Sequence, residues 1–275
     1  MAEQNNQVQL KNYNRRSVLN YIRKNGTATK AGLASATGLT FMAIKKILEE
    51  LEKLNLIKGG QLESTGGRRA LSYAINENYR YSIGIHINKF VTRVAVMNLR
   101  GQVIAMEKLS MDRGFSGQNE FVEMLSRSVE WVIERSGVEH GKILGIGVGV
   151  PGPVDYAEGV ILTPPNMPIL NYLPLREILE KNTGIPVFVN KDTNVIAFGE
   201  YWCGEARDCS TLVYTDVDMG IGSGLIIDGK LNIGANGIAG EFGHITVDIN
   251  GALCNCGNRG CLEAYSSDTA VLRLC

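Results

Sequence analysis

The 275-residue sequence lacks any uninterrupted hydrophobic run close to the ~20 residues that a membrane-spanning helix needs. It does not open with the basic and apolar regions of a secretory signal peptide. Its six cysteines do not form the regular pattern of a disulfide framework. These absences argue against a membrane protein and against an exported one. We therefore expect a protein of the reducing cytoplasm.

The chain also has no net charge, because 28 lysines and arginines balance 28 aspartates and glutamates. The balance is uneven along the sequence: residues 1–75 carry 12 basic and 5 acidic residues, whereas residues 76–275 carry 16 and 23. A basic N-terminal module on an acidic body is expected when one end binds nucleic acid, although an unevenly charged solvated surface gives the same numbers. The length and the 44% hydrophobic content suit two or three globular domains.

One histidine and three cysteines follow the spacing H-x9-C-x-C-x4-C in a glycine-rich stretch, at positions His244, Cys254, Cys256 and Cys261. Three thiolates and one imidazole are the ligand set of a closed, tetrahedral, structural zinc site. The alternative is a group of free thiols beside an unrelated histidine. Two carboxylates, Glu241 and Glu263, bracket the motif although a structural zinc does not need them. They indicate a ligand pocket built beside the metal loop.

The first 75 residues have the pattern of a winged helix-turn-helix. After a polar start over residues 1–13, which we expect to be disordered, the pattern predicts a helix over 15–24, a short helix ending at Thr37-Gly38, and a third helix capped by Thr40. The third helix has an apolar face made by Phe41, Ile44, Ile47, Leu48 and Leu51. Strands are predicted at 56–58 and 71–75, with a basic Gly-Gly-Arg-Arg turn between them.

In this arrangement the third helix would enter the major groove of DNA and the basic turn would reach phosphates. The candidate DNA-binding residues are Thr40, Met42, Ala43, Lys45, Lys46, Arg68 and Arg69. The alternative is a winged helix used for protein contacts.

The body of the chain alternates predicted strands and helices, and this pattern alone indicates only an α/β fold. The predicted strands cover residues 81–87, 91–98, 103–109, 143–150, 187–189, 211–214, 224–227 and 244–247. The predicted helices cover about 119–136, 175–182 and 192–203.

The stretches G-x-A-G-E-x-G-H at 237–244 and C-x-C-G-x-x-G-C-x-E at 254–263 resemble the ROK family of sugar kinases and sugar-responsive repressors. The N-terminal module resembles the winged helix of ROK repressors, such as those that respond to xylose or N-acetylglucosamine. The resemblance implies an actin-like (ribonuclease H-like) two-lobed domain. The expected divisions are a winged helix over 1–76, a linker over 77–80, a first lobe over 81–190 and a second over 191–275. Since ROK proteins continue for about one hundred residues more, we expect the second lobe to be incomplete.

The resemblance also assigns roles to individual residues. It places His244, Cys254, Cys256 and Cys261 on zinc, with the second ring nitrogen of His244 turned toward the sugar. The implied sugar-binding residues are Gly152, Asn166, Lys191, Asp192, Glu241, His244 and Glu263. Asp192 stands at the catalytic base of the family's Asn-Asp-x-Asn motif, although it could equally be a helix N-cap. Lys191 departs from the motif, which has asparagine there.

Two glycine-rich loops that bind ATP phosphates in ROK kinases are altered. In the first, Gly-x-Asp-x-Gly-Gly-Thr, the sequence has His86 for the aspartate and Asn88 and Lys89 for the two glycines. In the second, Gly-Thr-Gly-x-Gly, Asp218 and Met219 replace the first two residues. A carboxylate there would repel a phosphate. We therefore treat Asp192 as a vestigial base and expect no kinase activity.

From the sequence we hypothesise that the protein is a sugar-responsive transcriptional regulator, and specifically a repressor. It would bind operator DNA, a monosaccharide or sugar phosphate, and a structural zinc ion. It would act as a homodimer or higher homo-oligomer, in which the sugar changes the spacing of two winged helices. Two alternatives stay open: an active ATP-dependent sugar kinase with an added DNA-binding module, and a DNA-binding protein whose sugar pocket is vestigial.

Overall fold

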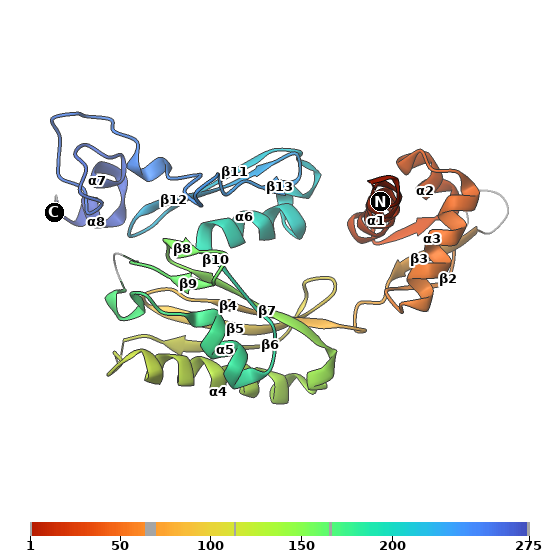
Figure 1. The fold of residues 1–275 in the computed structure, drawn as a ribbon, viewed down its shortest axis with the longest axis horizontal. Coiled ribbons are helices and arrows are strands. Elements are labelled where there is room, and N and C mark those ends of the chain that lie inside the picture. Colours follow the sequence, from red (N-terminus) through yellow and green to blue (C-terminus); the bar gives the residue numbers. More distant parts are fainter. Residues whose placement is uncertain (1, 64–69, 113, 165–166, 274–275) are drawn as a thin grey trace. The chain divides into compact units, whose positions relative to one another are not determined.

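The computed structural model describes residues 2–63, 70–112, 114–164 and 167–273 (Figure 1). The predicted site residues Arg68, Arg69 and Asn166 lie outside these ranges. Contacts divide the chain into two compact units. The first comprises Met1–Tyr81 with Asn98–Gln102, and the second comprises Ser82–Met97 with Val103–Cys275. Among the described residues, no helix combines the length and the apolar character needed to cross a membrane.

The first unit is a winged helix-turn-helix. It contains α1 (Ala2–Asn25), α2 (Lys30–Thr37) and α3 (Phe41–Lys53), with strands β1 (Thr27–Thr29), β2 (Ile57–Glu63) and β3 (Ala70–Ile75). The predicted cap of the third helix is confirmed, because Thr40 Oγ1 accepts a hydrogen bond from Ala43 N. The structure also shows a cap on α2, where Thr29 Oγ1 accepts from Gly32 N. Gly38 ends α2 in the left-handed conformation, with φ of 69°.

Two details of the first unit differ from the prediction. Helix α1 begins at Ala2, so the polar start is helical rather than disordered. β1 is a third strand, which pairs antiparallel with β3. The predicted hairpin of β2 and β3 is confirmed, and its turn lies outside the described residues. The core of the unit is formed by Val18, Ile22, Leu33, Ile44, Ile47, Leu48, Leu51, Ile57 and Tyr73.

The second unit begins with a five-stranded sheet in the order β10-β7-β4-β5-β6. Its strands are β4 (Tyr81–His86), β5 (Val91–Asn98), β6 (Val103–Ser110), β7 (Ile143–Val150) and β10 (Val187–Lys191). β5 and β6 are antiparallel, and β10 runs parallel to β7. Helices α4 (Gln118–Ser136) and α5 (Leu175–Thr183) cover one face, and α6 (Asp192–Trp202) lies on the other (Figure 1). A small hairpin of β8 (Val154–Asp155) and β9 (Val160–Ile161) follows β7.

Helix α6 also packs against a second sheet, formed by β11 (Leu212–Val217), β12 (Ile221–Ile227) and β13 (Lys230–Leu231). Glycines in β12 permit this close approach. A Cβ atom on Gly222 would lie 2.7 Å from Thr193 Cγ2, and one on Gly224 would lie 2.6 Å from Ala197 Cβ. Thr193 Oγ1 donates to the carbonyl of Ser223 at 3.1 Å. One helix therefore holds both sheets, and its first residue is Asp192.

The segment after β13 is mostly loop, with short helices α7 (Glu263–Ser266) and α8 (Asp268–Leu272). The strand predicted at 244–247 is wrong. His244 ends a 3-10 helix, Phe242–His244, and Thr246 makes only a single bridge to Cys261. Other 3-10 turns are His140–Lys142, Pro168–Leu170 and Glu205–Asp208.

Candidate functional site

Four potential metal ligands lie together in the C-terminal loops. The ligand atoms of His244, Cys254, Cys256 and Cys261 are all within 4.8 Å of one another. The loop that carries them is closed by backbone contacts: Cys254 N donates to Asn258 O, and Val247 N donates to Gly260 O at 2.7 Å. Gly260 has a φ of 69°, and a side chain there would collide with the backbone of Asp248. A glycine is thus required at position 260 for the loop to fold around the four ligands.

The spacing of these atoms fits a tetrahedral ion. Cys256 Sγ and Cys261 Sγ are 3.7 Å apart, and Cys254 Sγ is 3.8 Å from His244 Nδ1. A tetrahedron with metal–sulfur bonds of about 2.3 Å has edges of roughly 3.8 Å. Burial raises the pKa of Cys261 to about 12. Such a thiol stays protonated at neutral pH unless a cation beside it compensates the charge of the thiolate. The cluster can therefore hold a metal ion.

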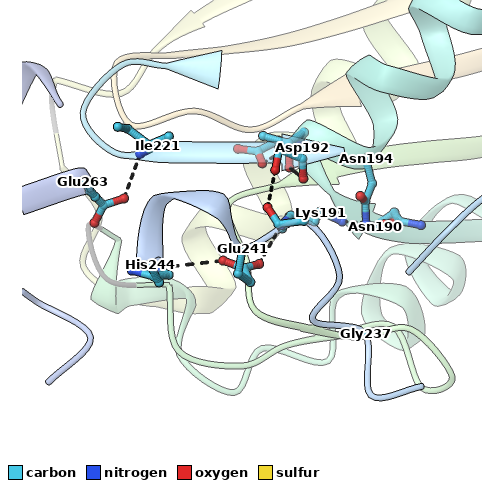
Figure 2. Close-up of polar contacts among 12 residues, drawn as sticks. Asn190, Lys191, Asp192, Asn194, Ile221, Gly237, Glu241, His244 and Glu263 are labelled. Carbon is cyan, nitrogen blue, oxygen red and sulfur yellow. Dashed lines mark hydrogen bonds and ion pairs between the residues drawn. The ribbon is translucent and has the colours of Figure 1, made fainter. Parts of the chain in front are cut away.

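His244 connects this cluster to a polar cleft. Its Nδ1 atom faces Cys254, while its Nε2 atom is 3.9 Å from Glu241 Oε2 (Figure 2). A metal on one ring nitrogen fixes which tautomer the other nitrogen presents. The arrangement allows the metal loop to orient a hydrogen-bonding group inside the cleft.

The cleft is a pocket of about 630 Å³ within the second unit. Its lining brings together residues separated by more than one hundred positions in the sequence. Six of the seven predicted sugar-binding residues line it: Gly152, Lys191, Asp192, Glu241, His244 and Glu263. Their grouping in one pocket agrees with the predicted site, and their role in binding stays a prediction.

Lys191 lines this pocket and is largely buried. Its ammonium group donates to Glu241 Oε1 at 2.6 Å (Figure 2), and its side chain is only 9% exposed. A Cβ atom on Gly152 would be 3.1 Å from Lys191 Cδ and 3.2 Å from Cγ. The aliphatic part of Lys191 therefore lies against the bare backbone of Gly152.

Asp192 stands beside Lys191 at the first turn of α6. Burial raises the pKa of its carboxyl to about 6, and the hydrogen bond from Thr193 N and the charge of Lys191 oppose part of that rise. The helix cap position belongs to Lys191, so Asp192 is not the N-cap. A carboxyl with a pKa near neutral can accept a proton or a hydrogen bond from a hydroxyl group in the pocket.

The second carboxylate beside the metal loop has a backbone partner. Glu263 Oε2 accepts a hydrogen bond from Ile221 N at 2.7 Å (Figure 2). Gly220 precedes that amide, and a Cβ atom there would be 2.6 Å from the same oxygen. Glu263 thus joins the metal loop to the turn between β11 and β12, which also contains Asp218.

The turn after β4 faces the same pocket through Asn88 and Lys89. Within it, the side chain of Asn88 accepts a hydrogen bond from Phe90 N at 3.1 Å. Burial lowers the pKa of His86, the last residue of β4, and the charge of Arg93 lowers it further. At both turns a backbone amide donates to a side chain, Phe90 N to Asn88 and Ile221 N to Glu263.

Sequence reasoning missed Tyr156, which also lines the pocket. Its hydroxyl donates to the carbonyl of Gly237 at 3.1 Å, and its ring occupies the place where a side chain on Gly237 would lie. Asn194 Nδ2 approaches the same hydroxyl at 3.5 Å. The only sequence signal was Gly237 itself, which begins the 237–244 motif.

A separate candidate surface lies on the first unit. At the start of α3, Thr40, Met42, Lys45 and Lys46 are exposed, with Met42 at 70%, and Ala43 is half-buried. Lys45 approaches Glu49 at 3.9 Å across one turn of the helix. The prediction that Phe41 belongs to the apolar core face is wrong, because Phe41 is 55% exposed. It precedes Ile44, the first buried position of the helix, and adds an aromatic ring to the exposed surface.

Comparison with known protein families gives two matches. The profile of the ROK family matches residues 82–275. A profile described as winged helix-turn-helix DNA-binding matches residues 11–58.

Individual proteins give the same picture. The xylose repressor of Caldicellulosiruptor bescii is 34% identical over 268 residues, covering 97% of this chain and 67% of that protein. The glucokinase of Thermotoga maritima is 35% identical over 191 residues, covering 70% of this chain and 58% of that enzyme. A crystal structure of a ROK family transcriptional regulator, a homologue of the E. coli MLC protein, superimposes with a TM-score of 0.78 at 27% identity. That match covers 96% of this chain and 67% of the other.

Proposed function

The chain belongs to the ROK family, and on that premise we propose that it is a sugar-responsive, DNA-binding transcriptional repressor. The observation that carries the proposal is the presence of two candidate binding surfaces in one chain. A winged helix leaves the first turns of α3 exposed, and the second unit contains a polar cleft beside a cluster of one histidine and three cysteines. The xylose repressor is similar over both parts, whereas the glucokinase is similar over 70% of the chain.

DNA binding is assigned to the start of α3 and to the turn of the β2–β3 hairpin. Lys45 and Lys46 would contact phosphates, while Met42 and Phe41 offer apolar surface that suits thymine methyl groups. Ala43 is small enough for close approach to base edges. Arg68 and Arg69 complete the proposed interface. We further propose that the regulator acts as a homodimer, since paired recognition helices are the common way to read two operator half-sites.

Zinc is the metal that best suits the cluster. Three thiolates and an imidazole at tetrahedral spacing are a typical structural zinc set. His244, Cys254, Cys256 and Cys261 would hold the ion, which when bound supplies a rigid cross-link between the loops. The chain itself supplies the rest: Nε2 of His244 and the carboxylates of Glu241 and Glu263 would hydrogen-bond a sugar.

The alternative of an active sugar kinase is favoured by one observation, the carboxyl of Asp192 with its pKa of about 6, in a chain that is 35% identical to a glucokinase over 191 residues. Phosphoryl transfer, however, depends mainly on positioning and on neutralising phosphate charge. Phe90 N and Ile221 N are already bonded to Asn88 and Glu263, and Asp218 adds a negative charge at the same turn. These contacts support a pocket that binds sugar without transferring phosphate.

The proposal is tested by linkage between sugar and DNA. DNA sites are selected from a random duplex pool with the purified chain, and the affinity for the best site is measured by fluorescence anisotropy with and without each of a panel of monosaccharides. We expect at least one sugar to lower DNA affinity by about 5- to 150-fold, the usual range of allosteric coupling. Selection that yields no preferred site, or sugar binding that leaves DNA affinity unchanged, would contradict the repressor function.

A further inference from the structure

Among the described residues, two lysines line the pocket, Lys89 and Lys191, and Lys191 is held by contacts on both sides. Its stem rests on Gly152, and its ammonium group is held by Glu241 at 2.6 Å. The two residues of the ion pair are separated by 50 positions, and the pair spans the cleft from the end of β10 to the loop before the metal cluster. Lys191 therefore occupies the volume between Gly152 and Glu241.

The pair also uses the hydrogen-bonding capacity of Glu241. Oxygen Oε1 accepts from Lys191, and oxygen Oε2 faces Nε2 of His244. A ligand hydroxyl that binds Glu241 must share an oxygen with one of these groups or displace the ammonium. Displacement would leave a side chain that is 9% exposed without its ionic partner, which is costly.

The electrostatics of the pocket disfavour an anionic ligand. Within the described part of the chain, five carboxylates line it, at Asp192, Asp216, Asp218, Glu241 and Glu263, against two lysines, Lys89 and Lys191. The charge of Lys191 is already balanced by Glu241. A sugar phosphate or sugar acid would therefore face the remaining carboxylates, while Lys191 is already paired with Glu241.

We propose that Lys191 is a specificity-determining residue, which restricts the pocket to a neutral sugar of pentose size by filling the place over Gly152 that the hydroxymethyl group of a hexose would take. The inference rests on the proposed sugar-binding function. The ROK motif has asparagine at this position, and the side chain of lysine reaches two bonds further from its Cα atom than that of asparagine. Two bonds are also the length by which a hydroxymethyl arm extends a pyranose ring. Shortening residue 191 should therefore admit the larger sugar.

The test uses sugar pairs that differ only in this group: D-xylose with D-glucose, L-arabinose with D-galactose, and D-lyxose with D-mannose. Dissociation constants are measured by calorimetry, without DNA, on the zinc-loaded protein. For the wild type we expect one pentose to bind about tenfold or more tightly than its hexose partner, the usual effect of one group that does not fit. In Lys191→Asn the ratio should fall to about one or reverse, and Lys191→Gln should be intermediate.

Lys191→Met is the matched control, because it keeps most of the length and loses the charge. It should retain the preference for the pentose, although its absolute affinity can change. A wild type that prefers the hexose, glucuronate or glucose 6-phosphate would overturn the inference, as would a pentose-to-hexose ratio that is the same in Lys191→Asn. In both cases sugar binding itself survives. If no sugar binds the wild type or any variant, the proposed function fails and the inference fails with it.

Discussion

Asp192 carries a carboxyl group whose charge is disfavoured by its position between two sheets. Burial raises its pKa from 3.8 to about 6 in the folded chain. A raised carboxyl pKa means that the folded state binds the proton more tightly than the unfolded state. This residue therefore lowers stability as pH rises from about 4 to about 6, and the loss is complete above that range.

We predict that Asp192→Asn stabilises the chain at neutral pH. The full shift corresponds to about 3 kcal/mol at pH 8, as an upper limit, and about half of that at pH 5. Urea denaturation between pH 5 and pH 8 measures the difference. Asp228→Asn, at an exposed position, is the control for loss of one charge. A gain that does not grow with pH would show that the surroundings of Asp192 do not disfavour its charge. The same variant should bind sugar more weakly, because a neutral amide replaces a charged acceptor.

A second prediction at this scale concerns the cluster of His244 with its three cysteines. Protein purified without chelator should contain about one zinc per chain by mass spectrometry of the metal. Cys256→Ser should lower zinc content, thermal stability and sugar affinity together, because a structural ion contributes directly to folding and holds His244. Cys209→Ser, at an exposed cysteine outside the cluster, should change none of the three. Wild-type protein without zinc would disprove the assignment.

At the scale of single elements, α3 has two faces with different tasks. Ile44, Ile47, Leu48 and Leu51 are buried and hold the helix in the core. The residues between them point outward, and the cap by Thr40 fixes where the first exposed turn begins. Neutralising a lysine on the outer face should therefore change binding without changing the fold.

We predict that Lys45→Ala and Lys46→Ala each weaken DNA binding and reduce the slope of log affinity against log salt by about one. Lys53→Ala, at the other end of the same helix, is the control and should leave the slope nearly unchanged. Titrations at several salt concentrations give both quantities. Equal losses in all three variants would indicate a general charge effect and not a defined interface.

The second feature at the scale of single elements is the close packing of helix α6 against strand β12. A side chain on Gly224 would collide with the carbonyl of Thr193 and with Ala197, and a backbone atom cannot move aside as a flexible side chain can. Gly199, on the same helix, has open space around it. The packing of α6 against β12 therefore requires a glycine at position 224 but not at position 199.

We predict that Gly224→Ala lowers stability by about 1–3 kcal/mol, the typical effect of overpacking. Gly199→Ala should be neutral or stabilise by up to about 1 kcal/mol, since alanine is the better helix former. Thermal unfolding of both variants measures these changes in stability. Sugar binding should also weaken in Gly224→Ala, because a displaced α6 moves Asp192. A tolerated Gly224→Ala would mean that the two elements are less tightly packed than the distances indicate.

At the scale of the whole molecule, the pocket contains a carboxyl group that can accept a hydrogen bond. Two turns beside it have backbone amides that already donate to side chains. Asp192 is present, but Asn88 bonds Phe90 N and Glu263 bonds Ile221 N. If phosphate were to bind at these two turns, it would have to displace both contacts and approach Asp218. We therefore expect sugar binding without catalysis.

We predict no sugar-dependent consumption of ATP by protein whose sugar binding has been verified. The assay should cover aldoses, ketoses and amino sugars, with a ROK glucokinase as the positive control. Turnover of about 1 s⁻¹ or more, the usual range for kinases, would overturn the repressor-only function. Asp192→Asn should leave the background rate unchanged, which separates true turnover from a contaminating enzyme.

The sequence alone determined those features that a few neighbouring residues encode. The cap at Thr40 and the stop at Gly38 depend on local backbone hydrogen bonds, so the helices of the first unit were predicted within a few residues, apart from the start of α1. The cysteine spacing already contained the possible metal cluster. Strands β5 and β7 were placed at their observed bounds for the same reason, since each is an apolar run between turn residues.

Only the tertiary structure decided what distant residues do to one another. Nothing in the sequence indicates that the aliphatic part of Lys191 lies on Gly152, or that Glu263 accepts from the amide of Ile221. These contacts, and the ion pair of Lys191 with Glu241, join positions that are 39 to 50 residues apart. The exposure of Phe41 and the missing strand at 244–247 have the same cause. Helical period and strand propensity describe a segment by itself, whereas burial and pairing depend on which other segments reach it. Six residues that line the pocket were predicted from motifs that resemble the ROK family, but the contacts between them became visible only in the folded chain.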